Sequence, residues 1–309
     1  MRVIITGGTG LIGSTLAANM VADNHDVIVL SRSPQKKAPS LPDAVQVVGW
    51  DARTAEGWGH LAEGADAIVN LAGANLAGTD FFPQRWTDER KRVIRDSRVN
   101  AGRALVDAVE RARQKPRVVI QASGVGYYGD RGDEILDEDA SPGRGFLAEL
   151  AAEDWEPSTA PVEEMGVRRA IVRSGGVFST EEGALPRLVL PFHLFVGGHI
   201  GSGDQWVSWI HIQDEVRAIR FLIEHQEARG AFNLVAPEPM TNAGLAKTIG
   251  QVMNRPVWIP LPGFAMRLAF GEVADVLLES QRAIPKRLLD LGFEFRFPEA
   301  RAALRDLLK

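Results

Sequence analysis

The chain has 309 residues, a hydrophobic content of 45%, no cysteine and a formal net charge of −5. This composition supports a large packed core, and the missing cysteines exclude disulfides, thiolate metal sites and a cysteine nucleophile. The acidic balance argues against a nucleic-acid-binding surface, and no stretch approaches the ~20 apolar residues that a membrane-spanning helix needs. The chain starts in a strand pattern without a basic-then-apolar leader, so we expect a cytoplasmic protein.

The first predicted element is a strand, a glycine-rich turn and a helix. A β-branched run at residues 3–6 leads into glycines with the spacing Gly-x-x-Gly-x-x-Gly, and an apolar stretch follows. Glycine lets backbone N–H groups approach a pyrophosphate closely, and the helix adds the positive end of its dipole. In this context the pattern favours a dinucleotide site over an ordinary tight turn. The predicted cofactor-binding residues here are Gly7, Thr9, Gly10, Leu11, Ile12 and Gly13.

Strand and helix patterns alternate through the first half of the chain. Strands are predicted at residues 3–6, 26–30, 45–49, 67–71, 117–122 and 168–173. Several are apolar throughout, as expected of parallel strands that are covered on both faces. Residues 86–114 have helical periodicity, and Lys115-Pro116 ends that helix. This alternation predicts an α/β Rossmann fold with a doubly wound parallel sheet.

The pattern loosens after residue 175. Short strands are predicted at 209–212, 232–235 and 257–259, and helices at 214–225, 242–253 and 264–280. We therefore expect residues 1–175 to form an NADP-binding Rossmann domain. Residues 176–309 are expected to form a smaller C-terminal α+β substrate lobe, and the two lobes can interleave.

The residues after the second strand indicate which nicotinamide cofactor binds. An NAD site usually places a carboxylate about 20 residues beyond the glycine turn, and this chain has Ser31 and Arg32 there instead. Arg32 suits a 2′-phosphate through charge-assisted hydrogen bonds, Ser31 adds a hydroxyl donor, and Lys36 and Lys37 add positive potential. The alternative is a solvated surface arginine. We predict that the cofactor is NADP(H).

Two more strand ends carry candidate cofactor contacts. Asp51 follows the third strand, where it can accept from the adenine amino group or simply hold a turn, and both readings stay open. Asn70, Leu71, Ala72 and Gly73 end the fourth strand. Small residues there let the backbone approach the ribose and diphosphate, at the sheet edge where such folds bind ligands.

Several motifs together resemble a known family. Residues 6–13, 70–73 and 99–102 are similar to extended and atypical short-chain dehydrogenases/reductases, a group that includes the nucleotide-sugar epimerases. Residues 85–87, 97–98, 123–129, 209–212, 271–272, 280–281 and 292–293 resemble an epimerase-like family of unknown substrate with a C-terminal domain of unknown function. The resemblance covers essentially the whole chain. It implies cofactor contacts from Ser31, Arg32, Asn70, Leu71 and Arg98, although the charge pattern alone describes Arg98 as part of a solvated helix face.

The usual catalytic pair of this superfamily is missing. Most members use Tyr-x-x-x-Lys with a nearby serine, because the lysine lowers the tyrosine pKa. The chain has only two tyrosines, Tyr127 and Tyr128, and neither is followed by a lysine at that spacing. Ser123, at the end of the fifth strand, can bond a carbonyl or hydroxyl beside the nicotinamide. The predicted catalytic residues are Ser123 and Tyr127, although both tyrosine rings also suit packing or lining a pocket.

His211 and Asp214 invite a metal or catalytic interpretation. We favour a structural one, in which His211 closes a strand and Asp214 caps the following helix, and we predict no metal site.

The sequence leaves two candidate functions. One is an NADP(H)-dependent, nucleotide-sugar-epimerase-like oxidoreductase or epimerase that acts on a small-molecule substrate, which the second lobe favours. The other is a noncatalytic NADP(H)-binding redox sensor or scaffold, which the missing catalytic pair favours.

Overall fold

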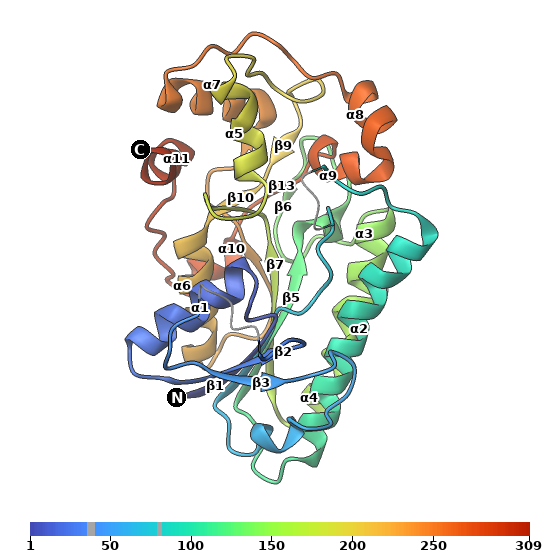
Figure 1. Cartoon of the computed structure of the whole chain (residues 1–309), viewed down its shortest axis with the longest axis vertical. Helices are drawn as coiled ribbons and strands as arrows, with labels where there is room; N and C mark the ends of the chain where they lie inside the picture. The colour runs from blue at the N-terminus through green and yellow to red at the C-terminus, as the bar shows by residue number, and fades with distance from the viewer. Residues whose placement is uncertain (36–40, 79–81) are drawn as a thin grey trace.

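A seven-stranded parallel sheet forms the centre of the computed structural model, which describes residues 1–35, 41–78 and 82–309 (Figure 1). Its strand order is β11-β7-β5-β4-β1-β2-β3, so the order reverses beside β1, as in Rossmann folds. The strands are β1 (Arg2–Thr6), β2 (Asp26–Ser31), β3 (Gln46–Gly49), β4 (Ala67–Asn70), β5 (Val118–Gly124), β7 (Arg168–Ser174) and β11 (Gly230–Leu234). The predicted fold class and the six strands predicted before residue 175 are confirmed.

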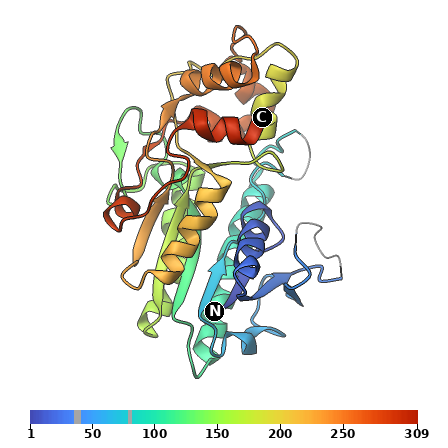
Figure 2. The same ribbon diagram turned by 90° about the vertical axis from the view of Figure 1, so that its left-hand side faces the viewer.

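Helices cover both faces of the sheet (Figure 2). On one face lie α1 (Leu11–Ala22) and α6 (Ile212–Glu224), and on the other lie α2 (Asp88–Arg111) and α4 (Pro161–Glu164). Successive residues of β1 point to opposite faces, so Ile5 joins the core beneath α1 and α6, whereas Ile4 joins the core beneath α2. Both isoleucines are fully buried, which explains why the strand is apolar throughout.

The residues after β7 contribute to the sheet and also form a cap at its carboxyl edge. β11 lies beyond residue 175 and pairs with β7 along its whole length. The cap contains α5 (Leu185–His193), α7 (Asn242–Met253), α8 (Gly263–Phe270), α9 (Asp275–Leu278) and α11 (Ala300–Leu308). Its own core includes Phe192 of α5, Ile249 of α7 and Leu304 of α11. In Figure 1 the cap lies above the sheet.

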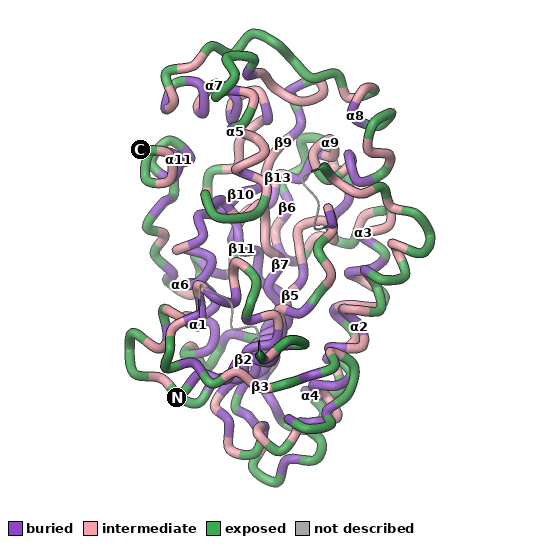
Figure 3. The backbone as a smooth tube through the Cα atoms, in the orientation of Figure 1, coloured by how far each residue is buried: buried purple, intermediate pink, exposed green. Residues whose placement is uncertain are grey.

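Short strand pairs and helical turns join the sheet to the cap. The pairs are β6 (Ile135–Leu136) with β13 (Arg282–Ala283), β8 (Gly176–Phe178) with β10 (Trp209–His211), and β9 (Trp206–Val207) with β12 (Met240–Thr241). The helical segments are α3 (Phe146–Glu149), a π turn (Leu150–Trp155), a 3₁₀ turn (Pro157–Thr159) and α10 (Lys286–Asp290). Figure 3 shows buried residues along the central strands and exposed residues in the outer loops.

Three local predictions after residue 175 are wrong. Residues 257–259 are not a strand, because Pro256 and Pro260 flank them and interrupt any ladder. The helix predicted at 264–280 is divided, since α8 ends at Phe270 and Gly271 follows with φ +66°. Asp214 does not cap α6. The cap is His211, whose ring nitrogen accepts from the Gln213 N–H group.

Two absences can be stated for the described residues. Within residues 1–35, 41–78 and 82–309, no helix is long and apolar enough to cross a membrane. The same residues contain no group of three or more histidine, aspartate or glutamate side chains that could hold a metal ion.

Candidate functional site

The glycine turn packs too tightly for side chains at two positions. Gly7 has φ +66°, and a Cβ there would lie 2.6 Å from the Leu71 carbonyl oxygen at the end of β4. A Cβ at Gly13 would lie 2.5 Å from the Gly7 carbonyl oxygen. Gly10 is exposed and caps α1 without a side chain, so the first N–H groups of that helix are left for an anion. The turn therefore fits the pyrophosphate of a dinucleotide.

The end of β2 presents a cation. Arg32 is exposed, and the neighbouring Ser31 is 8% exposed with its hydroxyl accepting from the Ser33 N–H group. Lys36 and Lys37 lie outside the described residues. Arg32 thus occupies the position where the sequence predicts a 2′-phosphate contact.

Asp51 holds its own turn after β3. Its carboxylate accepts from the main-chain N–H groups of Arg53 and Thr54, both at 2.8 Å, and from the Thr54 hydroxyl at 2.9 Å. These three hydrogen bonds stabilise the turn, so Asp51 acts as a turn residue. The contact with adenine stays a prediction.

Asn70 links three strand ends instead of presenting its side chain at the surface. It is 1% exposed, its carbonyl oxygen accepts from the Thr6 hydroxyl at 2.6 Å, and its amide donates to Gln121 at 2.9 Å. These bonds join β1, β4 and β5 beside the glycine turn. Ala72 is also buried, with its N–H group bonded to Thr6, whereas Leu71 is half-buried and Gly73 is exposed. The Asn70 side chain is thus occupied by hydrogen bonds within the sheet, and the cofactor contacts at this strand end stay a prediction.

Arg98 is buried, in contrast to the solvated helix face that its neighbours suggest. It is 6% exposed, it donates to the carbonyl oxygens of Ala74 and Ile94, and its guanidinium carbon lies 4.6 Å from the ring centroid of Trp155. Burial lowers the pKa of Arg98 to about 10. Its Nε atom is buried without a hydrogen-bond partner among the described residues. A buried arginine with a spare donor is consistent with a site for a polar ligand.

A cavity of about 330 Å³ brings predicted cofactor and catalytic residues together. We call it the reaction cavity. It lies at the carboxyl ends of β5 and β7, and Ile12 of the glycine-turn helix, Arg98, Ser123 and Tyr127 all line it. Ligands of doubly wound sheets bind at this edge. The other predicted residues of the glycine turn lie outside its lining.

Glu156 is the partner of Ser123. The Ser123 hydroxyl donates to the Glu156 carboxylate at 2.7 Å, and both residues are less than 10% exposed. Arg173 of β7 donates two hydrogen bonds to the same carboxylate, at 2.9 and 3.0 Å. Glu156 lies on the irregular helical segment after Gly145, between the π turn and the 3₁₀ turn. The sequence analysis did not predict this pair, because Ser123 and Glu156 lie 33 residues apart and no local spacing joins them.

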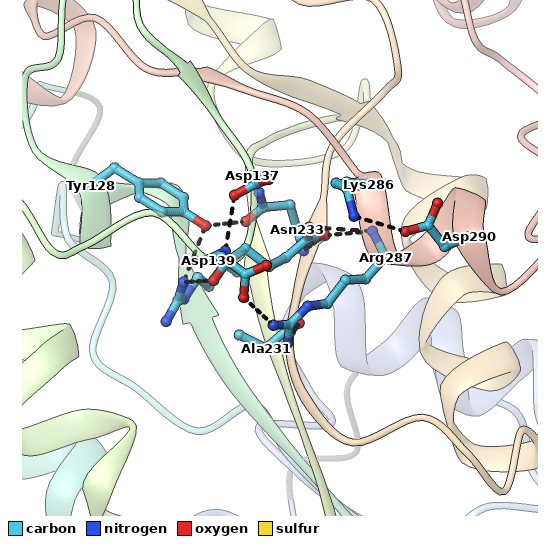
Figure 4. A network of polar contacts seen from close by, with 10 residues as sticks. Tyr128, Asp137, Asp139, Ala231, Asn233, Lys286, Arg287 and Asp290 are labelled. Carbon is cyan, nitrogen blue, oxygen red and sulfur yellow. Dashed lines mark hydrogen bonds and ion pairs between the residues drawn. The ribbon is translucent and has the colours of Figure 1, made fainter.

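The two tyrosines have different surroundings. Tyr128 is fully buried, donates to Asn233 at 2.7 Å and accepts from Arg173 at 3.1 Å, and Figure 4 shows its hydroxyl pointing at Asn233. Burial raises the pKa of Tyr128 to about 12. Tyr127 is half-buried and faces the reaction cavity, with the guanidinium carbon of Arg173 3.4 Å from its ring centroid. Tyr128 is thus a packing residue, and Tyr127 lines the pocket.

A second serine–carboxyl pair lies behind the cavity wall. Ser174, which lines the cavity, donates to Glu215 of α6 at 2.6 Å. Glu215 is fully buried, and its second carboxyl oxygen has no partner within the described part of the chain. Burial raises the pKa of Glu215 to about 8, so this acid is largely protonated at neutral pH. The sequence contained no signal for this pair.

Asp214, the residue before Glu215, joins α6 to the C-terminal segment. Its carboxylate accepts from the main-chain N–H groups of Arg296 and Phe297, at 2.9 and 2.7 Å, and from Arg217 at 2.8 Å. This explains how Asp214 can be fully buried without acting as a cap.

Solved structures of known proteins share this fold. The human epimerase family protein SDR39U1, solved with NADPH, is 35% identical over 99% of both chains and superposes with a TM-score of 0.88. The UDP-glucose 4-epimerase of Thermus thermophilus, solved with NAD, is 16% identical with a TM-score of 0.77, which shows the fold alone.

Two family models and several curated relatives match the chain. The model of the NAD dependent epimerase/dehydratase family matches residues 3–234, and a domain of unknown function, DUF1731, matches residues 261–307. The chloroplastic SDR39U1 homologue of Arabidopsis thaliana is 37% identical over the whole chain and 87% of its own length. The epimerase family protein YfhF of Bacillus subtilis is 34% identical over the whole chain and 98% of its own length. The resemblance expected from the sequence is confirmed, and the chain belongs to the NAD dependent epimerase/dehydratase family, with a C-terminal DUF1731 domain.

Proposed function

We propose that this protein is an NADP(H)-dependent oxidoreductase or epimerase that acts on the alcohol or carbonyl group of a small molecule. The observation that carries the proposal is the hydrogen bond that Ser123 donates to the buried Glu156, because Ser123 lines the reaction cavity together with Ile12 and Arg98. This hydrogen bond supports a proton-transfer role for Ser123 and Glu156, because Ser123 lines the same cavity as residues predicted to contact the cofactor.

The residues present fit a nicotinamide dinucleotide. The main chain of the glycine turn can hold the diphosphate, because Gly7 and Gly13 leave no room for side chains and Gly10 leaves the helix N-terminus open. Arg32 can bind a 2′-phosphate, and the human relative solved with NADPH supports this choice. When bound, the nicotinamide supplies or accepts a hydride.

The Ser123–Glu156 pair provides a route for the proton. Since the Ser123 hydroxyl donates to Glu156, its oxygen keeps lone pairs to accept from a substrate alcohol. In the oxidation direction the substrate loses hydride from carbon, its O–H proton passes to Ser123 Oγ, and the serine proton moves to the Glu156 carboxylate. The products are a carbonyl group and a neutral Glu156, and reduction runs through the same transfers in reverse. Arg173 holds the carboxylate in place from the other side.

The proposal is tested with purified protein in two steps. The first step measures NADPH and NADH binding by nicotinamide fluorescence, and we expect tighter binding of NADPH. The second follows nicotinamide absorbance with carbonyl and alcohol substrates. Failure to bind either nucleotide would refute the proposal. Binding of NADPH without turnover of any substrate, together with different affinities for NADPH and NADP⁺, would instead support the redox-sensor alternative.

A further inference from the structure

An apolar cavity of about 520 Å³ adjoins the reaction cavity. We call it the apolar cavity. The two share lining residues from the cap and from the segment after β4, which are Leu76, Ala184, Leu188, Asn242, Leu245, Val276 and Leu277. Its other walls include residues of α5, α7 and α8, residues 259–261, and residues of the loop after α5. A cavity of this size matches a small organic ligand.

The side chains that line the apolar cavity are predominantly aliphatic and aromatic. Val196, Ile259 and Leu261 are each more than 40% exposed although they line it, so the cavity is open to solvent at these residues. Of the polar side chains, Asn242 is already engaged, because its carbonyl oxygen accepts from the Ile200 N–H group at 2.7 Å. Apolar surface left exposed around a cavity favours an apolar ligand, since covering it releases water.

The charges of the two cavities do not suit a diphosphate. Among the described residues that line them, the aspartate, glutamate, lysine and arginine side chains are Arg98, Arg187 and Glu279. Burial raises the pKa of Glu279 to about 7. Arg98 donates from Nη1 to two carbonyl oxygens and keeps only the buried Nε as a spare donor, and Arg187 also has an interaction partner. Glu279 would repel a phosphate whenever it is ionised. Sites that bind diphosphates through side chains present arginines or lysines that are directed at the oxygens.

We infer that the substrate is a lipophilic alcohol or carbonyl compound, with its oxygen at Ser123 and its hydrocarbon body in the apolar cavity, and that it is not a nucleoside diphosphate sugar. This inference rests on the proposed function for the position of the oxygen. The hydrocarbon part rests independently on the lining of the apolar cavity.

A fluorescence experiment tests the hydrocarbon part without turnover. The apolar dye N-phenylnaphthylamine is titrated into the NADPH-loaded protein and then displaced with decanol or with UDP-glucose. We expect the dye to bind, decanol to displace it and UDP-glucose to leave it in place. Ile259→Glu places a carboxylate in the lining at a half-exposed position, and we expect it to weaken dye binding at least about tenfold. Leu289→Glu is the matched control, because Leu289 is 47% exposed on α10, away from both cavity linings, and should bind the dye like wild type.

The outcomes separate this inference from the proposed function. Absence of dye binding, equal binding by Ile259→Glu and wild type, or displacement by UDP-glucose would each overturn the inference, even if NADPH binds normally. Loss of NADPH binding in wild type would overturn the proposed function, whatever the dye does. Reduction of NADP⁺ with decanol, with neither oxidation nor epimerisation of UDP-glucose, supports both, whereas turnover of UDP-glucose alone overturns the inference and retains the redox function.

Discussion

The hydroxyl of Ser123 donates a 2.7 Å hydrogen bond to the carboxylate of Glu156, which lies 33 residues further along the chain. Ser123 lines the reaction cavity, and the chain has no tyrosine followed by a lysine at the Tyr-x-x-x-Lys spacing. The same carboxylate also accepts two hydrogen bonds from Arg173, so its position is determined from two strands, β5 and β7. The predictions below start from this relationship.

Glu156→Gln should abolish most turnover and leave NADPH binding intact. The amide keeps the shape of the side chain but cannot take up the proton from Ser123, so we expect kcat to fall at least about 100-fold. The variant also leaves Arg173 without its buried anion, so the free energy of unfolding should fall by about 3 kcal/mol. The measurements are NADPH oxidation with decanal, nucleotide fluorescence and thermal unfolding. A variant that retains wild-type kcat would exclude Glu156 from proton transfer.

Arg32→Ala should change the choice of nucleotide. Loss of a charge-assisted contact to the 2′-phosphate should weaken NADPH binding by roughly 10- to 100-fold and leave NADH binding nearly unchanged. Fluorescence titration of both nucleotides measures the ratio. The control is Arg103→Ala, which removes an exposed arginine from α2 and should leave both affinities unaltered. Equal losses for NADPH and NADH in Arg32→Ala would refute the phosphate contact.

Gly13→Ala and Gly10→Ala form a matched pair in the glycine turn. A Cβ at Gly13 would lie 2.5 Å from the Gly7 carbonyl oxygen, so the turn must shift, at a cost of about 1–3 kcal/mol in unfolding free energy. A Cβ at Gly10 has its nearest neighbour at 3.5 Å, so the free protein should keep its melting temperature. Thermal unfolding without nucleotide compares the two. Similar melting temperatures for both variants would contradict the close packing at Gly13.

The Tyr128 hydroxyl should stay protonated at neutral pH and well above it. Burial disfavours the phenolate and raises the pKa of Tyr128 to about 12. In Tyr127→Phe, Tyr128 is the remaining tyrosine, so tyrosinate absorbance should stay low until the pH approaches about 12. The same variant unfolded in denaturant should ionise near pH ~10. Ionisation of the folded variant near pH ~10 would show that Tyr128 is accessible to water.

Glu215→Gln should make the stability of the protein less sensitive to pH. The pKa of Glu215 is raised to about 8 by burial, whereas an unfolded glutamate titrates near ~4.3. The folded state therefore binds the extra proton, and wild type should lose stability as the pH rises from ~4.3 to about 8. The variant lacks this loss, so its melting temperature relative to wild type should increase across that range by several degrees. Glu164→Gln, which changes an exposed glutamate, should show no such trend.

The sequence by itself determined the sheet and the nucleotide turn of this protein. Strand β1 and helix α1 follow from local rules, because apolar runs of strand length and the spacing of glycines act within a few residues. Gly7 illustrates this, since its φ of +66° is accessible to glycine at no steric cost. The same local reasoning failed at residues 257–259, where Pro256 and Pro260 outweigh the β-branched composition.

Only the tertiary structure determined which hydrogen-bond partners and which burial the residues at and around the reaction cavity have. Ser123 meets Glu156 across 33 residues, and Tyr128 meets Asn233 across 105 residues, so no local pattern encodes either bond. Arg98 belongs to a charged helix segment by sequence, yet packing against Trp155 buries it. Burial and hydrogen-bond partners depend on which elements pack together, and that is determined by the assembled sheet and cap. The chemistry of this protein therefore depends on the tertiary structure, and its nucleotide turn on the local sequence.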